Sequence, residues 1–254
     1  MRETKQDNMT LRDLSFSFII LFVLSLSSAS SETNPSPEAN EKATLRLRIH
    51  LTTGLSMTKK GVNMSNWITP KMIEEKVLPE VNRIWSQANI EWILDGIQDC
   101  PTKDTNRDEV VAYVLATQRD SEGHGDPERI QKYLSILPID QEEDRVVNIY
   151  AVPYLGGTSQ GNACKGARIL LGEWTDKPSG GKLPPQKCLL VEPEPFVKGS
   201  FGRTMAHELG HILGLHHPKE REVPQLMGGG GYILTEEQKN TAREKAYKIT
   251  VKQK

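Results

Sequence analysis

The chain has 254 residues, of which 37% are hydrophobic, and its formal net charge at pH 7 is −1. A chain of this length and composition can bury one well-formed hydrophobic core. The near-neutral charge gives no electrostatic preference for nucleic acid or for an anionic membrane surface, so we expect neither as a partner.

The first 30 residues have the pattern of a secretory signal peptide. The apolar stretch Phe16–Leu26 is followed by the small residues Ser27–Ser30. This stretch is too short to span a bilayer as a helix. We therefore expect residues 1–30 to be a signal peptide and the mature protein to be secreted (extracellular or periplasmic), with no stable membrane span. Either Met1 or Met9 fits as the start of translation.

A polar, proline-containing linker is expected over residues 31–42, and a folded domain over residues 43–254. The first element of this domain is a strand over Thr44–Leu51, where apolar and mostly basic residues alternate as in a half-buried strand. His50 falls on the polar side of this alternation. We therefore expect His50 to be solvated and not to bind a metal.

A helix is predicted over residues 68–88, because apolar residues recur there at helical spacing and Pro70 lies near its start. Pro79 lies inside this segment and is expected to kink the helix. Two further strands are predicted at residues 90–94 and 146–152.

Two helices are predicted between those strands, over residues 108–118 and 126–136. A turn-rich loop is expected at residues 154–161, and the apolar run Ala167–Leu171 follows it. We interpret Ala167–Leu171 as an edge strand, whose free backbone groups could pair with an extended peptide. A buried strand fits the same residues equally well.

The residues from His207 to His217 spell H-E-x-x-H-x-x-G-x-x-H. Residues four apart share one face of a helix, so His207 and His211 can point at a single ion. Gly214 permits the sharp turn that ends the helix and brings His217 round as a third ligand. Three protein ligands leave a fourth position open, which is typical of a catalytic zinc and not of a structural one. His216 is expected to be solvated or to support a ligand.

A methionine-containing segment, Gln225-Leu226-Met227-Gly228, follows this motif. Together the two segments resemble the metzincin clan of zinc endopeptidases, from about Ala43 to the C-terminus. The resemblance implies an α+β fold that consists of a twisted mixed sheet with backing helices and an active-site helix. It also implies that Met227, in the methionine turn, forms an apolar floor beneath the three imidazoles.

The branch within the clan stays open. His124-Gly125-Asp126 resembles part of the structural-zinc site of the matrixins, but no histidine lies between His124 and His207. We therefore expect His124 to be a loop residue and the protein to bind one zinc ion. A proline directly after the third histidine, Pro218, is a feature shared with the serralysin branch, although no calcium-binding repeats follow.

The resemblance implies that His207, His211 and His217 hold one catalytic Zn²⁺ and that Glu208 is the catalytic general base. The zinc would activate a water molecule and polarise the scissile carbonyl of an extended polypeptide, and Glu208 would pass the proton to the leaving amine. Two alternatives are an extracellular zinc-containing module that binds peptides without cleaving them, and a hydrolase of non-peptide amides. Glu208 favours catalysis, because pure binding has no need of a carboxylate there.

Export permits disulfide bonds, and the chain has three cysteines. Cys164 and Cys188 flank a long loop rich in glycine and proline, so we expect them to pair, while a pair that includes Cys100 stays open. Asn63-Met64-Ser65 is a glycosylation sequon in a eukaryotic host. The sequence does not specify an oligomeric state.

The last predicted element is a helix that begins at Thr235-Glu236-Glu237-Gln238, the pattern of a capping box. It is expected to run to about Tyr247 and to pack behind the site.

Overall fold

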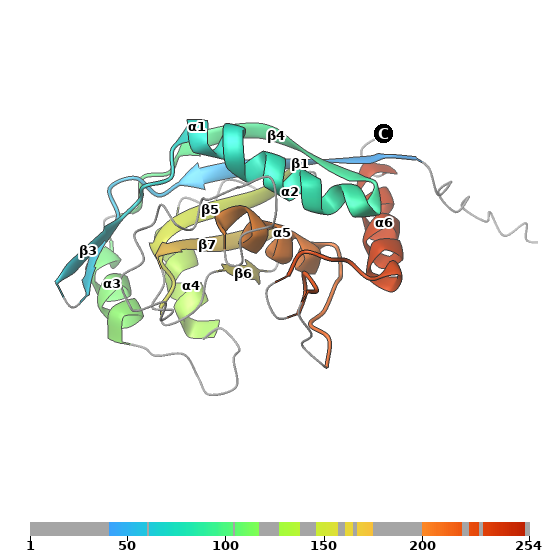
Figure 1. Cartoon of the computed structure of the whole chain (residues 1–254). Helices are drawn as coiled ribbons and strands as arrows, with labels where there is room; N and C mark the ends of the chain where they lie inside the picture. Colours follow the sequence, from blue (N-terminus) through green and yellow to red (C-terminus); the bar gives the residue numbers. More distant parts are fainter. Residues whose placement is uncertain are drawn as a thin grey trace, which may run out of the picture. The chain divides into compact units, whose positions relative to one another are not determined.

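A five-stranded sheet forms the centre of the computed structural model (Figure 1). The structure describes residues 41–251, apart from residues 60 and 104 and the segments 117–126, 138–145, 157–160, 165–166, 175–199, 220–223 and 229–230. All the described residues belong to one compact unit, which spans Pro37–Lys254.

The sheet is mixed. In spatial order its strands are β4 (Ile90–Asp99), β1 (Ala43–Leu51), β5 (Val146–Tyr154), β7 (Arg168–Trp174) and β6 (Gly161–Cys164). The first four strands are parallel to their neighbours, and β6 pairs antiparallel with β7 at the edge of the sheet. A separate hairpin is formed by β2 (Ser56–Lys59) and β3 (Val62–Ser65).

Helices cover both faces of the sheet. They are α1 (Pro70–Met72), a π-helical segment η1 (Ile73–Val77), α2 (Leu78–Trp85), a 3₁₀ turn η2 (Ser86–Ala88), α3 (Arg107–Ala116), α4 (Pro127–Ile136), α5 (Phe201–Ile212) and α6 (Glu236–Val251). The chain thus combines helices with a mixed sheet, which is compatible with the predicted α+β class.

Two hydrophobic clusters fill the space on either side of the sheet. One contains side chains of α2, α5 and α6 with one face of β1, β4, β5 and β7. The other contains side chains of α3, α4 and the β2–β3 hairpin with the opposite face of β5 and β7. Parallel strands buried on both faces are typically hydrophobic along their length, and eight of the nine residues of β5 are buried.

The burial of both faces overturns the prediction for His50. Its side chain is only 2% exposed, it stacks on Tyr150 at 4.5 Å, and its Nε2 lies 2.9 Å from Asn148 Oδ1. The alternation in β1 was interpreted as one solvated face, whereas the second hydrophobic cluster covers the end of that face. His50 lies outside the group of histidines that could hold a metal.

Of the two interpretations of Ala167–Leu171, the edge strand is wrong and the buried strand is confirmed, since Ile169, Leu170 and Leu171 are fully buried. Ala167–Leu171 overlaps β7, which is paired on both sides, by β5 and by β6. The edge belongs to β6, whose four residues lie at the end of the segment interpreted as a loop and just beyond it. Such a short strand of glycine, asparagine, alanine and cysteine carries no alternation from which it could be predicted.

The helical run after β3 begins as predicted. Thr69 caps it by accepting a hydrogen bond from the Met72 N–H, and Pro70 is its first residue. Pro79 does not end the run; the wide π turn η1 lies directly before it, where the Leu78 N–H donates to the Ile73 carbonyl. A wider turn accommodates a proline ring, which would otherwise press on the carbonyl four residues earlier.

The capping box before α6 is confirmed. The Gln238 N–H donates to Thr235 Oγ1 at 3.2 Å, and the Thr235 N–H donates to Gln238 Oε1 at 3.1 Å. The helix then runs to Val251, beyond the predicted Tyr247, and packs against β1.

The predicted signal peptide, His124 and Cys188 lie outside the described residues. Cys100 and Cys164 are not joined to each other, and the pairing of Cys164 with Cys188 stays a prediction. The sequon residue Asn63 is exposed on β3.

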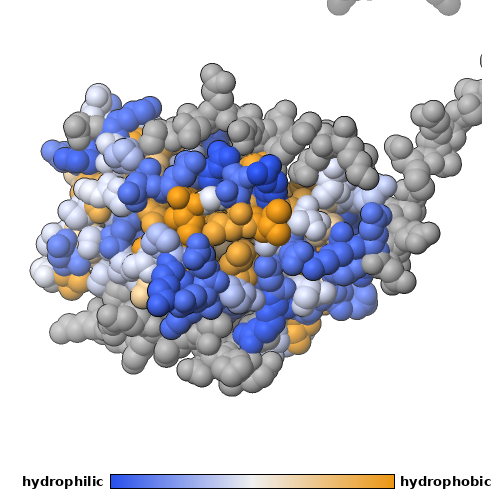
Figure 2. All heavy atoms as spheres, turned by 90° about the horizontal axis from the view of Figure 1, so that it is seen from above, coloured by the Kyte–Doolittle hydropathy of each residue, from blue (hydrophilic) through white to orange (hydrophobic). Residues whose placement is uncertain are grey.

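Among the described residues, no helix has both the length and the apolar character needed to cross a membrane. The face seen from above carries a band of hydrophobic side chains bordered by hydrophilic ones (Figure 2). Ile93, on the edge strand β4, is 41% exposed.

Candidate functional site

Helix α5 carries the histidine motif and is capped at both ends. At its start, Ser200 Oγ accepts a hydrogen bond from the Arg203 N–H at 3.0 Å. At its end, the Gly214 N–H donates to the His211 carbonyl and the Leu215 N–H donates to the Gly210 carbonyl, the two bonds of a Schellman motif. Gly214 has φ = +82°, so the predicted sharp turn at this glycine is confirmed.

This turn brings His217 back beside the helix. His207 Nε2 and His217 Nε2 lie 3.0 Å apart. One nitrogen from each of His207, His211 and His217 lies within 4.8 Å of the other two, so the three side chains could hold a metal ion. His216 is exposed and is not a member of this group. The structure therefore brings together the three histidines that the sequence selected.

Backbone carbonyls orient two of the three rings. His207 Nδ1 lies 2.7 Å from the Leu226 carbonyl oxygen, and His211 Nδ1 lies 2.8 Å from the Leu215 carbonyl oxygen. A carbonyl only accepts hydrogen bonds, so each Nδ1 carries the proton and each Nε2 keeps a lone pair that could bind a metal ion. Burial lowers the pKa of His207 to about 3 and also lowers the pKa of His211, which keeps both imidazoles neutral.

Met227 lies against α5 at the glycine between Glu208 and His211. It is fully buried, and a Cβ added to Gly210 would lie only 2.6 Å from Met227 Sδ. The segment around Met227 is closed by hydrogen bonds from the Tyr232 N–H to the Pro224 carbonyl and from the Leu226 N–H to the Ile233 carbonyl. Gly210 thus allows the methionine turn to approach the helix closely.

Glu208 lies beside His207 on α5, and the edge strand β6 covers its side chain. It is 6% exposed, and its carboxylate accepts a hydrogen bond from the Ala163 N–H. A Cβ added to Gly161 would lie 2.7 Å from Glu208 Oε1, so the backbone of β6 rests directly on this carboxylate. Burial raises the pKa of Glu208 to about 8.

A second buried carboxylate fixes the start of α5. Ser200 Oγ lies 2.7 and 2.8 Å from the two oxygens of Glu80, which belongs to α2. A Cβ added to Gly202 would lie 2.4 Å from Glu80 Oε2. Glu80 is 1% exposed, and its burial raises its pKa. This contact joins the site helix to the helix packed beside it.

Sequence reasoning did not single out Gly161, Gly210, Glu80 or Arg203. Gly210 lies at a variable position of the histidine motif. A glycine at that position is the signal from which a close approach of another segment to the helix could have been predicted. The other three act through contacts between segments far apart in the chain, which spacing along the sequence does not reveal.

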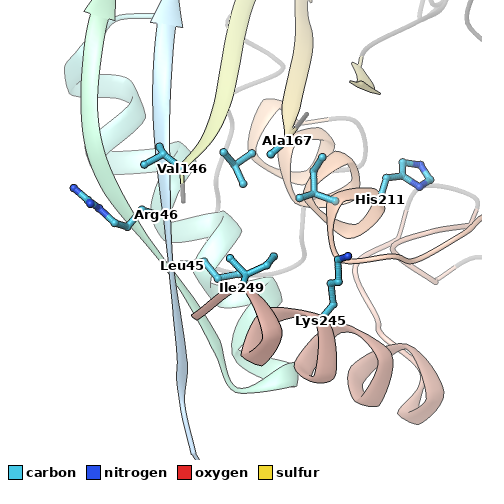
Figure 3. Close-up of a pocket in the computed structure, with 9 residues that line it drawn as sticks. Leu45, Arg46, Val146, Ala167, His211, Lys245 and Ile249 are labelled. Carbon is cyan, nitrogen blue, oxygen red and sulfur yellow. The ribbon is translucent and has the colours of Figure 1, made fainter. Parts of the chain in front are cut away.

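A separate cavity of about 340 Å³ lies behind the last turn of α5 (Figure 3). Leu45, Val147, Ile212 and Ile249 are among the residues that line it. His211 is also among the lining residues, although Figure 3 shows its ring pointing away from the other side chains drawn there.

No protein family model matches this chain, and no curated protein has significant sequence similarity to it.

Proposed function

We propose that this chain is a secreted, zinc-dependent endopeptidase of the metzincin type, with Glu208 as its catalytic general base. The observation that carries the proposal is the convergence of His207, His211 and His217 beside a buried carboxylate.

The donor set suits zinc. Nitrogen ligands bind Zn²⁺ at about 2.0–2.1 Å in tetrahedral geometry, which separates two such nitrogens by roughly 3.4 Å. The separation of 3.0 Å between His207 Nε2 and His217 Nε2 is close to that value. Neutral imidazoles with Nδ1 bonded to carbonyls are the usual form of histidine ligands. When bound, zinc supplies a Lewis acid that polarises a carbonyl and lowers the pKa of water.

Glu208 supplies the proton transfers in this proposal. Its carboxylate takes the proton from the attacking water and delivers it to the nitrogen of the leaving amine. The Ala163 N–H holds one side of the carboxylate, which fixes its orientation.

The substrate in this proposal is an extended polypeptide that pairs with β6. Among the residues that the structure describes, this strand pairs with β7 alone, so its other side could add a further strand. Pairing through backbone groups tolerates many side chains, and the same strand touches Glu208 through Gly161 and Ala163. The scissile bond of a peptide bound there would lie next to the general base.

A peptide-binding module without catalysis is the second candidate. The burial of Glu208 under β6 favours it, because a general base must reach the attacking water.

One experiment distinguishes the endopeptidase from the binding module. The purified mature protein is incubated with a denatured protein mixture, and new peptide termini are identified by mass spectrometry. We expect new termini with the metal-loaded protein, none with a zinc chelator, and recovery when zinc is restored. Zinc binding without any new termini would support the binding module.

A further inference from the structure

A buried arginine lies inside the methionine turn. Arg203 is on α5, one helical turn before His207, and is 8% exposed. Its Nε donates to the Gly231 carbonyl at 2.9 Å, and its Nη2 donates to the Leu226 carbonyl at 2.5 Å. One guanidinium thus ties two points of the turn, on either side of Met227, to the helix.

The Leu226 carbonyl is shared. It accepts from Arg203 Nη2 and also from His207 Nδ1, which lies 2.7 Å away. Because a carbonyl oxygen has two lone pairs, it can accept both bonds. Its position determines where the His207 ring points, and the arginine restricts that position.

We propose that Arg203 is a positioning residue of the metal site, which holds the Leu226 carbonyl so that His207 presents Nε2 to the ion. This inference rests on the proposed function, since it requires that the histidines bind metal. Arginine suits the task better than lysine, because its planar group offers several donors at fixed angles and spans two carbonyls at once.

The competing explanation is that Arg203 only stabilises the core. Arg203 is buried, and its positive charge lies near the carboxyl groups of Glu80 and Glu208. Both features are compatible with that role. The two explanations differ in what a substitution does to the metal affinity of a protein that is still folded.

The test compares Arg203→Lys and Arg203→Met with wild type, after circular dichroism shows that the metal-free proteins are folded. Zinc affinity is measured by competition with a chromophoric chelator, and ligand geometry by the visible spectrum of the cobalt-substituted protein. Thr204→Val is the matched control, because Thr204 is the next residue of α5, is also buried, and its Oγ1 has no hydrogen-bond partner in the structure described.

Loss of a group that supports a metal ligand typically weakens metal binding by about 10–100-fold. We expect a loss in this range and a shifted cobalt spectrum for both arginine variants, and wild-type values for Thr204→Val. Zinc affinity and a cobalt spectrum equal to wild type in Arg203→Lys would overturn the inference, even if that variant unfolds more easily. If Arg203→Met does not fold, Arg203→Lys alone decides.

The two proposals fail in different ways. A wild-type protein that binds zinc but cleaves no peptide contradicts the proposed endopeptidase, and the affinities of the arginine variants still decide the role of Arg203. A wild-type protein that binds no zinc contradicts both.

Discussion

At the scale of single residues, two of the three histidines are each oriented by one backbone carbonyl. The Leu215 carbonyl that orients His211 is itself positioned by the turn at Gly214, where the Leu215 N–H bonds to the Gly210 carbonyl. The histidine motif therefore specifies both the proposed ligand His211 and the backbone that orients it.

We expect His211→Ala to lose the bound zinc ion, because two imidazoles leave too few protein ligands for a stable tetrahedral site. Elemental analysis of the purified variant measures the zinc-to-protein ratio directly. A His211→Ala protein with the full zinc content of wild type would show that the site lies elsewhere. His216→Ala is the control, since His216 is exposed and outside the group, and it should keep its zinc.

Gly161 is the residue through which β6 touches Glu208, the proposed general base. In Gly161→Ala the new Cβ would lie 2.7 Å from Glu208 Oε1, so the carboxylate must move. Displacing a catalytic group by about 1 Å can cost on the order of 100-fold in rate, and we expect a loss of that size in kcat/KM with zinc content unchanged. Gly96→Ala is the control, because nothing lies within 4 Å of a Cβ added there. Equal activity in the two variants would contradict the contact.

At the scale of elements, α5 is held at its N-terminus by Ser200. This residue caps the helix and also donates to the buried carboxylate of Glu80. We expect Ser200→Ala to lower the free energy of unfolding by about 2–3 kcal/mol. The substitution removes the helix cap and leaves the buried carboxylate of Glu80 without this hydroxyl donor.

Urea denaturation measures this loss. Ser86→Ala is the matched control, because the hydroxyl of Ser86 bonds to the Arg83 carbonyl at an exposed position. We expect the control to change the unfolding free energy by less than about 0.5 kcal/mol. Similar losses in both variants would show that the contact with Glu80 contributes little.

Local sequence signals predicted the elements with regular patterns. The spacing of His207, His211 and Gly214 predicted a helix and its end, and Thr235 predicted the start of α6. The apolar repeats predicted β1 and the helical run from Pro70, because burial of one face imposes a period on the chain.

What the sequence could not predict depends on tertiary contacts. β6 has only four residues and no alternation, so its place at the edge of the sheet is set by pairing with β7. His50 was assigned to a solvated face because β1 alternates, whereas it is buried and contacts Tyr150 and Asn148 of β5, a strand far away in the sequence. The role of Arg203 also could not be predicted, since the carbonyl groups that it binds lie more than 20 residues away in the sequence.

At the scale of the whole molecule, one buried carboxylate links stability to pH. Glu173 on β7 is 2% exposed and accepts hydrogen bonds from the N–H groups of Trp67 and Ile68. Burial raises its pKa from 4.5 to about 7, against the opposing effect of those two bonds. The folded protein therefore holds a proton at Glu173 that the unfolded chain releases between these pH values.

A raised pKa in the folded state stabilises the protein fully below pH 4.5, and this contribution is lost as the pH rises to about 7. The shift corresponds to roughly 3 kcal/mol. We expect Glu173→Gln, which stays neutral, to lose this pH dependence. Urea unfolding of the metal-free wild type and variant at pH 5, 6, 7 and 8 gives the difference in stability at each pH. A difference that does not change across this range would contradict the assignment.

The central claim is that Glu208 performs catalysis beside a zinc ion held by His207, His211 and His217, and the most direct test is the cleavage rate of Glu208→Gln at zinc content matched to wild type. The glutamine side chain is close in size and keeps an oxygen for the Ala163 N–H, so zinc and fold should be retained. It cannot accept the proton, and loss of general-base catalysis costs about 10²–10⁴ in rate. We predict that wild type cleaves a denatured protein mixture and that Glu208→Gln is slower by at least about 100-fold. Equal cleavage rates in the two proteins would contradict the mechanism.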